Sequence, residues 1–238
     1  MTRGGLALVA LVAFVALAGC AERLPRSAPP TQAQWTAARD RLAALRQTVP
    51  RAPYVQEVSI SFREPGTGKV FDGRGAIAVD PGHAMRMILV GPGGATALDA
   101  WVTKDQWRFS IPPLQLLRRG ATESPPGLPI GFFRWWFLGP FDGKLRTTSG
   151  RTLVLDDGSA IVGLDADEAD GVRTIAARRR HGTTIEWLGY EGHGAVVGVG
   201  DKATYRDLSS GLTVNVTVDR LGEAPPEPEV FRDPEGAP

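Results

Sequence analysis

The sequence predicts a mainly β protein with a few helices (class α+β), built around a barrel or strongly curved antiparallel sheet. Short segments of alternating apolar and polar residues recur between residues 54 and 221, and Gly- and Pro-containing turns separate them. An amphipathic segment precedes these strands, and an aromatic stretch at residues 130–138 interrupts them. A meander of this length curls rather than staying flat, because twist accumulates from strand to strand.

The N-terminus has the parts of a bacterial secretory signal. Arg3 supplies a positive charge, residues 6–18 are apolar and uncharged, and small residues precede Cys20. The alternatives are an ordinary signal peptide and a membrane helix, but the apolar run is shorter than the ~20 residues that a spanning helix needs. Residues 17–20 (LAGC) are similar to the lipobox of bacterial lipoproteins. We therefore expect residues 1–19 to be removed and Cys20, the only cysteine, to carry the lipid.

The charge balance leaves membrane attachment to that lipid. The chain has 27 Lys and Arg against 26 Asp and Glu, so it has no basic surplus for binding nucleic acid. More than one acyl chain is needed for durable anchoring, and a lipobox cysteine carries several. Ala21 follows Cys20 where an Asp commonly retains Gram-negative lipoproteins at the inner membrane. The expected location is therefore the periplasmic face of the outer membrane.

The rest of the chain is expected to form one domain. Residues 20–33 hold the lipidated cysteine and a flexible tether rich in Pro, Ala and Ser, residues 34–232 the domain, and residues 233–238 a flexible tail. Apolar residues at helical spacing from Trp35 to Val49 predict a helix that ends before Pro50. We expect it to cover the sheet. A membrane-surface helix is the weaker alternative, because its charges form no strongly basic face.

The predicted strands fall into two groups, separated by a loop region. We expect residues 114–131 to be loop-like, with one helical turn at 114–118, and residues 130–138 to be a short helix or packed loop on the sheet. The expected strands are 54–63, 70–80, 83–91, 95–104 and 106–111 in the first group, and 144–148, 152–156, 161–164, 171–180, 183–190, 195–207 and 212–221 in the second.

No catalytic site is predicted. Residues 65–69 (PGTGK) are similar to the end of a phosphate-binding loop. The motif needs Gly at position 63 and Ser or Thr at position 70, but this chain has Arg63 and Val70 there. We interpret this segment as a hairpin turn. A hydrolase would need a nucleophile beside a base, and no Gly-x-Ser-x-Gly elbow is present. The run Arg178-Arg179-Arg180-His181 is interpreted as a charged strand end.

No metal or cofactor site is predicted either. His83, His181 and His193 lie far apart, and none has metal-ligand spacing with another His or Cys. The acidic cluster Asp165, Asp167, Glu168 and Asp170 lacks the Gly and distal Glu of a calcium-binding loop. Such a run is typical of a solvated turn.

The absence of catalytic motifs leaves binding as the expected activity. One face of the predicted sheet is apolar, and a curled sheet of this kind is either filled by its own helices or open to an apolar ligand. Met residues on that face favour an adaptable surface. The candidate cavity residues are Val58, Ile60, Phe62, Phe71, Ile77, Val79, Met85, Met87, Leu89, Trp101, Trp107, Phe109 and Ile111.

A further signal lies in residues 73–79, 85–94, 98–101, 107–112 and 221–231. These segments resemble the LolA/LolB group, whose members handle lipoproteins on their way to the outer membrane. The order of elements is also similar, from the N-terminal helix through the meander and central insertion to the Pro-rich ending. This resemblance implies an incomplete curved antiparallel barrel, covered by the N-terminal helix and a central loop-helix insertion, with an apolar cavity for acyl chains.

Because the chain has a lipobox, the resemblance is closer to the anchored acceptor, LolB, than to the soluble carrier. It implies a monomer that binds lipid or lipoprotein acyl chains and receives cargo from a periplasmic carrier protein. The turn at residues 91–94 (GPGG) lacks the apolar tip expected for membrane insertion. Phe133, Trp135, Trp136 and Phe137 are the candidates for lid or membrane contacts instead. The alternative is a structural or assembly-scaffold lipoprotein with a filled barrel that binds another protein.

Overall fold

The computed structural model describes residues 28–167, 172–192 and 198–234. The expected signal peptide, Cys20 and most of the tether lie outside these residues. Within them the chain forms one 13-stranded sheet in which all neighbouring strands are antiparallel. The strands are β1 (Tyr54–Arg63), β2 (Val70–Asp80), β3 (Ala84–Val90), β4 (Thr96–Thr103), β5 (Trp107–Ile111), β6 (Leu116–Gly120), β7 (Lys144–Ser149), β8 (Thr152–Asp156), β9 (Ile161–Asp167), β10 (Val172–Arg180), β11 (Thr183–Gly192), β12 (Lys202–Asp207) and β13 (Thr213–Leu221).

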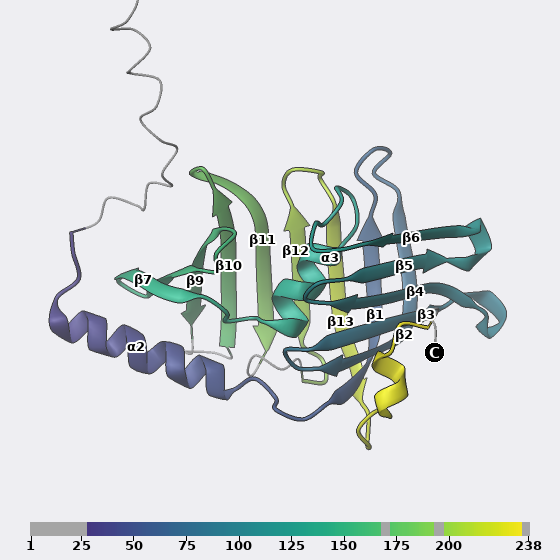
Figure 1. Ribbon diagram of the computed structural model, residues 1–238, viewed down its shortest axis with the longest axis horizontal. Helices are drawn as coiled ribbons and strands as arrows, with labels where there is room; N and C mark the ends of the chain where they lie inside the picture. Colours follow the sequence, from purple (N-terminus) through teal and green to yellow (C-terminus); the bar gives the residue numbers. More distant parts are fainter. Residues whose placement is uncertain (1–27, 168–171, 193–197, 235–238) are drawn as a thin grey trace, which may run out of the picture.

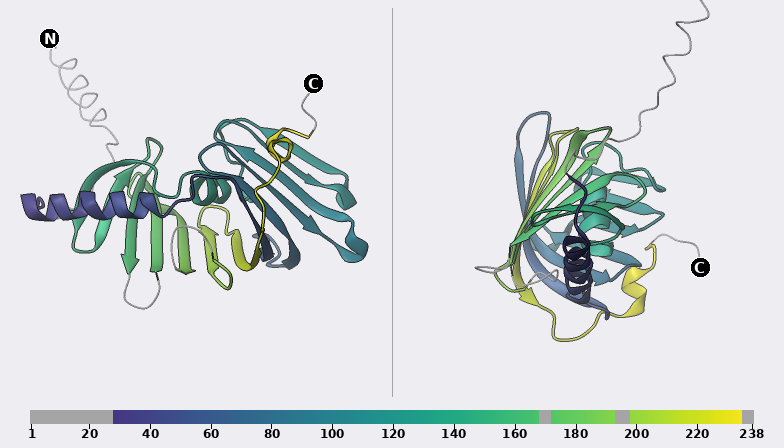
Figure 2. Two further views of the ribbon diagram at one scale, coloured as in Figure 1. Left: turned by 90° about the horizontal axis from the view of Figure 1, so that it is seen from below. Right: turned by 90° about the vertical axis from the view of Figure 1, so that its left-hand side faces the viewer.

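The sheet consists of two meanders joined in the middle. Its strand order is β6-β5-β4-β3-β2-β1-β13-β12-β11-β10-β9-β8-β7, so β6 and β7 are the two edges and the sheet does not close on itself. At the junction β1 pairs with β13, with Ile60 opposite Val216 and Val58 opposite Val218. These side chains are buried on the concave face. The sheet curves around that face, as the end-on view in Figure 2 shows.

Helix α2 (Gln32–Gln47) packs beside the β7 end of the sheet (Figure 1). Its N-terminus is closed by a capping box between Thr31 and Gln34. Ala38, Leu42 and Leu45 are buried along one side, which is the face that the helical spacing predicted. At its C-terminal end, Arg46 donates hydrogen bonds to the carbonyls of Phe141 (3.1 Å) and Gly143 (2.6 Å). The helix is thereby fixed to the segment that precedes β7.

The segment between the two sheet edges carries a second helical element. A single α-helical turn, α3 (Ile130–Phe132), continues into a π-helical turn, η3 (Phe133–Leu138). We call Ile130–Leu138 the aromatic insert. It lies against the concave side of the sheet, where it packs on β2, β3 and β4 (Figures 1 and 2). The insert therefore lies inside the curve of the sheet.

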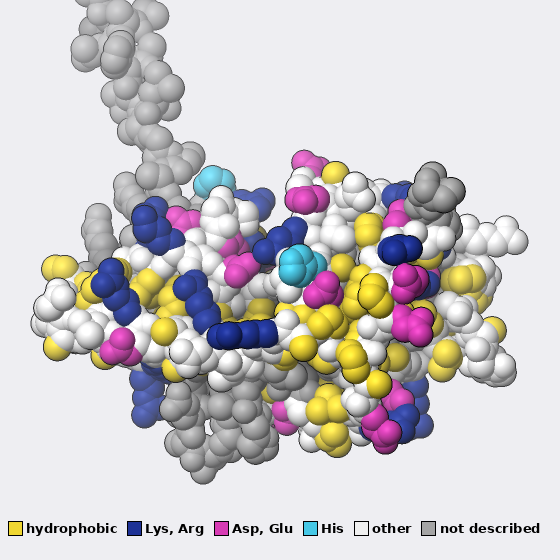
Figure 3. All heavy atoms as spheres, turned by 60° about the horizontal axis from the view of Figure 1, so that its bottom comes forward, with side chains coloured by type: hydrophobic (Ala, Val, Ile, Leu, Met, Phe, Trp, Pro, Cys, Tyr) yellow, Lys and Arg dark blue, Asp and Glu magenta, His cyan; other side chains and the backbone are white. Residues whose placement is uncertain are grey.

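The C-terminal segment covers part of the opposite, convex face. A 3₁₀ turn, η4 (Pro228–Phe231), packs on β2 and β3. The Trp101 indole nitrogen donates a hydrogen bond to the carbonyl of Phe231 at 2.7 Å. Nearby, Asp99 is bound by both Arg86 and Arg108 at 3.0 Å. The face in Figure 3 shows charges of both signs side by side, as expected from the balanced composition.

The structure confirms the predicted fold class, and it corrects two segments. The strand expected at residues 195–207 begins only at Lys202, because the described residues 198–201 form a turn. Residues 114–118 were expected to include a helical turn within a loop. The 3₁₀ turn lies earlier, at η2 (Pro112–Leu114), and residues 116–120 form the edge strand β6. Pairing explains the difference, because Ile111 to Trp107 of β5 lie opposite Leu116 to Gly120. A further 3₁₀ turn, η1 (Pro92–Gly94), forms the predicted turn between β3 and β4.

Candidate functional site

The concave face gathers most of the residues that the sequence proposed for a cavity. They come from β1 to β5, because alternate positions of paired strands point to the same side of a sheet. All of the following are buried and belong to one hydrophobic core together with the aromatic insert: Val58, Ile60, Ile77, Val79, Met85, Met87, Leu89, Trp107 and Phe109.

This interior is filled by side chains of the insert. The Phe132 ring lies 5.7 Å from that of Phe133 and 5.6 Å from that of Phe137. It also stacks on Tyr205 of β12 at 5.0 Å, while Trp136 packs on Tyr190 of β11 at 4.8 Å. The aromatic rings thus link the insert to the second meander. Within the described residues, these rings therefore occupy the apolar face that was proposed to border a cavity, as in the filled alternative.

Two of the proposed cavity residues lie elsewhere. Phe71, near the tip of the β1–β2 hairpin, is 57% exposed, because the sheet extends beyond the core there. Trp101 points to the convex face, where it binds the C-terminal segment, since its neighbours Ala100 and Val102 take the inward positions of β4. Phe62 and Ile111 are half-buried at the margin of the core.

The expected membrane contacts are also different in the structure. Phe133, Trp135, Trp136 and Phe137 were expected to be available to a membrane or to form a lid. All four are buried, at 0%, 7%, 3% and 3% exposure. The expectation of exposure was wrong for this conformation, because burying aromatic rings lowers the free energy relative to exposing them to water, and Trp136 also packs on Tyr190.

Arg134 ties the insert to the first meander. Its guanidinium donates hydrogen bonds to the carbonyls of Thr103 and Ala121 at 2.8 Å, and to that of Thr122. Burial lowers the pKa of Arg134, and the nearby Asp105 opposes that effect. These bonds join the β4–β5 turn, the segment after β6 and the insert at one charged group.

A charged network lies on the other side of the insert. Arg178 of β10 binds Asp157 at 2.9 Å and Glu186 of β11 at 3.0 Å, and its guanidinium lies 5.6 Å from the Trp135 ring centre. Glu186 also accepts a hydrogen bond from the Tyr205 hydroxyl at 2.7 Å. Burial, followed by the Glu186 charge, raises the pKa of Tyr205 and keeps its hydroxyl protonated.

A cleft of about 740 Å³ separates the insert from the ends of β8 to β12. This volume lies within the range of small-molecule sites, which is roughly 300–1,000 Å³. The sequence analysis did not predict the cleft, because its walls come from turns far apart in the chain. Its floor is partly apolar, while its walls carry Lys104, Glu123, Arg134, Asp142, Asp157, Arg178, Arg180, Glu186 and Asp207.

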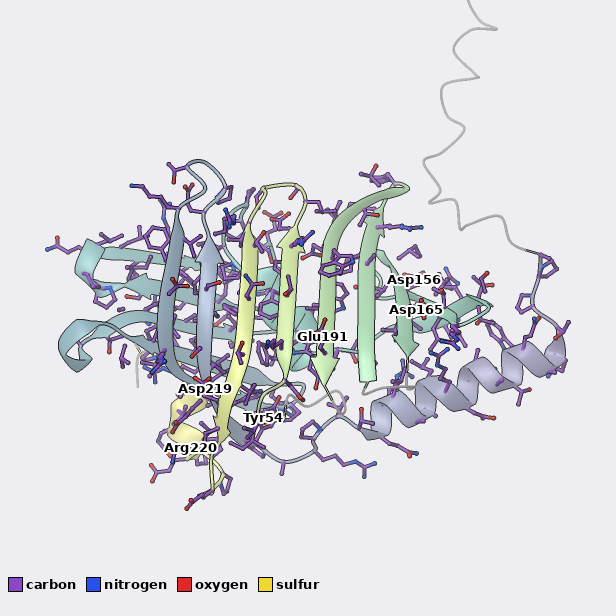
Figure 4. The ribbon with its side chains drawn as sticks, turned by 180° about the vertical axis from the view of Figure 1, so that it is seen from behind. Tyr54, Asp156, Asp165, Glu191, Asp219 and Arg220 are labelled. Carbon is purple, nitrogen blue, oxygen red and sulfur yellow. The ribbon has the colours of Figure 1, made fainter. Side chains whose placement is uncertain are left out.

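The acidic run near residue 165 does not build a metal site in the described structure. Asp165 is an exposed residue of β9, and Figure 4 shows it on the face away from the insert. Glu168 and Asp170 lie outside the described residues. Within the described ranges, no group of three or more His, Cys, Asp or Glu side chains could hold a metal ion. No helix among these residues is long and apolar enough to span a membrane.

The geometry defines a class of open-sheet protein with a filled interior and a charged cleft beside it. A solved DUF1329 family protein from Desulfovibrio piger has a similar fold, with a TM-score of 0.50 at 13% identity over 83% of this chain and 96% of that one. A LolA superfamily protein of Nitrosomonas europaea is similar at a TM-score of 0.48 and 11% identity, over 82% and 97% of the two chains.

A further solved domain, from Vibrio parahaemolyticus, is named as a candidate outer membrane lipoprotein-sorting protein. It is similar at a TM-score of 0.42 and 10% identity, over 82% of this chain and 97% of that one. No protein-family model matches the sequence, and no curated protein matches it significantly. At such low identities these likenesses concern the fold alone. The architecture implied by the LolA/LolB resemblance, an open curved sheet with a helical insertion, is the one that the structure has.

Proposed function

We propose that this protein is a lipid-anchored protein of the outer membrane that binds acyl chains of lipids or lipoproteins and takes part in lipoprotein localisation. Its role is that of a LolB-like acceptor, with Cys20 as the anchor. One observation carries the proposal. The sheet stays open between its edge strands β6 and β7, and the nine-residue segment Ile130–Leu138 packs within the apolar core on its concave face.

Acyl binding by this site requires the aromatic insert to move. The insert fills the interior with rings, and an acyl chain would take their place against Met85, Met87 and the other apolar residues of the concave face. A chain of ~16 carbons contributes on the order of 10 kcal/mol of apolar burial before the costs of binding are counted. The free-energy cost of exposing the rings of the insert to water opposes this binding. The apparent affinity then falls by the fraction of molecules that have the insert displaced.

Arg134 provides the test, because its hydrogen bonds hold the insert to the first meander. Arg134→Ala raises the fraction of open molecules, so the apparent Kd for a fluorescent fatty acid is expected to fall relative to the parent chain. Both chains carry Cys20→Ser so that they stay in solution. Arg51→Ala, at an exposed position outside the site, is the matched control. Thermal unfolding checks that each variant is folded.

Native mass spectrometry of the purified protein is a second test, because a protein that binds acyl chains is expected to retain copurified lipid. A folded chain that carries no lipid and binds no fatty acid, even as Arg134→Ala, would contradict the proposal. That result would favour the alternative, a structural or assembly scaffold that binds another protein. The filled interior is the observation that supports this alternative. Cross-linking in intact cells would then recover a protein partner.

A further inference from the structure

The aromatic insert separates two environments of opposite character. Phe132, Phe133, Trp136 and Phe137 point into the apolar core. On the other side, Gly131, Arg134, Trp135 and Leu138 line the charged cleft. An acyl chain that replaced the insert would lie in the core, and the polar end of the same molecule would lie at the cleft. The cleft is therefore placed to receive a headgroup.

Some charged groups of the cleft are already satisfied. Arg178 is bound to Asp157 and Glu186, and its side chain is 15% exposed. Asp207 accepts hydrogen bonds from Ser209 and Ser210. These groups stabilise the walls of the cleft, and a ligand would have to break existing pairs in order to use them.

Other charged groups of the cleft are available to a ligand. Arg180 is exposed and has no ion-pair partner within the described part of the chain. Lys104 and Asp142 are 3.7 Å apart, with side chains 56% and 67% exposed, so their pairing is weak. The Glu123 side chain is exposed as well. The available groups thus include both cations and carboxylates.

We propose that this cleft is a headgroup subsite for a zwitterionic phospholipid, in which Arg180 and Lys104 face the phosphate and Asp142 and Glu123 face the ammonium group. An anionic headgroup would meet the carboxylates unfavourably, and an uncharged one would leave both sets of charges unused. This inference rests on the proposed function, because it takes the acyl chain to lie where the insert is now.

The test compares three single-chain lipids with the same acyl chain: lysophosphatidylethanolamine, lysophosphatidylglycerol and monoacylglycerol. The Cys20→Ser chain is expected to bind the zwitterionic lipid most tightly. Arg180→Ala and Asp142→Asn are each expected to weaken that binding about two- to fivefold, as for exposed ion pairs. Neither variant should change the affinity for monoacylglycerol, and the control Arg51→Ala should change none of the three.

The outcomes separate this inference from the proposed function. Equal affinities for all three lipids, or tightest binding of lysophosphatidylglycerol, would overturn the headgroup subsite and leave acyl binding intact. An Arg180→Ala variant that weakens monoacylglycerol binding as much as phospholipid binding would also overturn it, because the effect would then not depend on the headgroup. If no lipid binds, even with Arg134→Ala added, the proposed function fails and the subsite with it.

Discussion

The guanidinium of Arg178 lies over the ring of Trp135, 5.6 Å from its centre. The same group is bound by Asp157, from the β8–β9 turn, and by Glu186, from β11. One side chain thus joins the aromatic insert to two separate parts of the second meander. Since the Arg178 side chain is only 15% exposed, these charges are screened less by water than a surface pair is.

Arg178→Lys is expected to lower the free energy of unfolding by roughly 1–2 kcal/mol. A lysine keeps the charge but loses the planar fork that binds two carboxylates while stacking on an aromatic ring. Urea unfolding measures the loss. Arg146→Lys is the control, because Arg146 pairs with Asp156 at the surface with 47% of its side chain exposed. An equal loss in both variants would contradict the special position of Arg178.

Gly131→Ala is expected to destabilise the docked insert. A Cβ atom at residue 131 would lie 2.5 Å from the Glu186 Oε1 atom, which is held by Tyr205. The resulting shift should cost about 1–3 kcal/mol, as overpacking does. Gly163→Ala is the control, since a Cβ there meets nothing closer than 3.9 Å. Thermal unfolding measures the stability of both variants. A Gly131→Ala variant as stable as Gly163→Ala would contradict the close contact with Glu186.

Trp101→Phe tests how the C-terminal segment is held on the convex face. The change keeps an aromatic ring but removes the hydrogen bond to the Phe231 carbonyl, at a cost of about 1 kcal/mol. Limited proteolysis should then cleave the segment at residues 228–234 faster. Trp187→Phe serves as the control, because Trp187 packs on Arg206 instead. Unchanged cleavage in the Trp101 variant would show that packing alone holds the segment.

Asp207 predicts a pH dependence of stability. Burial raises its pKa, but hydrogen bonds from Ser209 and Ser210 outweigh burial and hold the pKa below the ordinary value of 3.8. A lowered pKa in the folded state means that the ionised carboxylate stabilises the fold above pH 3.8. This contribution is lost as the pH falls through the folded-state pKa.

The double variant Ser209→Ala/Ser210→Ala removes the two hydroxyl hydrogen bonds to Asp207 and keeps the two backbone ones, so it removes part of this stabilisation. The parent chain should be more stable by about 1 kcal/mol at pH 7, discounted for the partial exposure of Asp207. The difference should shrink as the pH is lowered below 3.8. Denaturant unfolding over a pH series measures it, with Ser149→Ala as a control. A difference that stays constant with pH would mean that the two serines act without Asp207.

Local patterns were sufficient to predict most strands. The spans 54–63, 70–80 and 152–156 match β1, β2 and β8, because alternating residues and tight turns are read from neighbouring positions. Strand β6 was missed, since Arg118 and Arg119 break its alternation and only pairing with β5 makes it a strand. The pairing of β1 with β13 also depends on the tertiary fold, so the sequence pattern did not predict which strands meet at the junction.

The candidate site was predictable only in part. The apolar face was found, because burial follows period-two alternation. That the insert fills it depends on how rings pack in three dimensions, and no local signal reports that. The Arg178–Arg180 run was interpreted as a charged strand end. Its first member lies in a mostly buried network and its last is exposed in the cleft. The difference is set by Asp157 of the β8–β9 turn and Glu186 of β11, which both bind Arg178.

The β1–β13 junction also sets the order in which this molecule can be assembled. Either meander can form from neighbouring hairpins, but the two halves join only when the last strand, Thr213–Leu221, pairs with the first, Tyr54–Arg63. Such distant pairing is slow, because a long loop must close before any contact compensates for its entropy. Until then the β1 edge and the apolar face stay open to aggregation. A newly synthesised chain therefore keeps this edge and this face exposed for an extended period during folding.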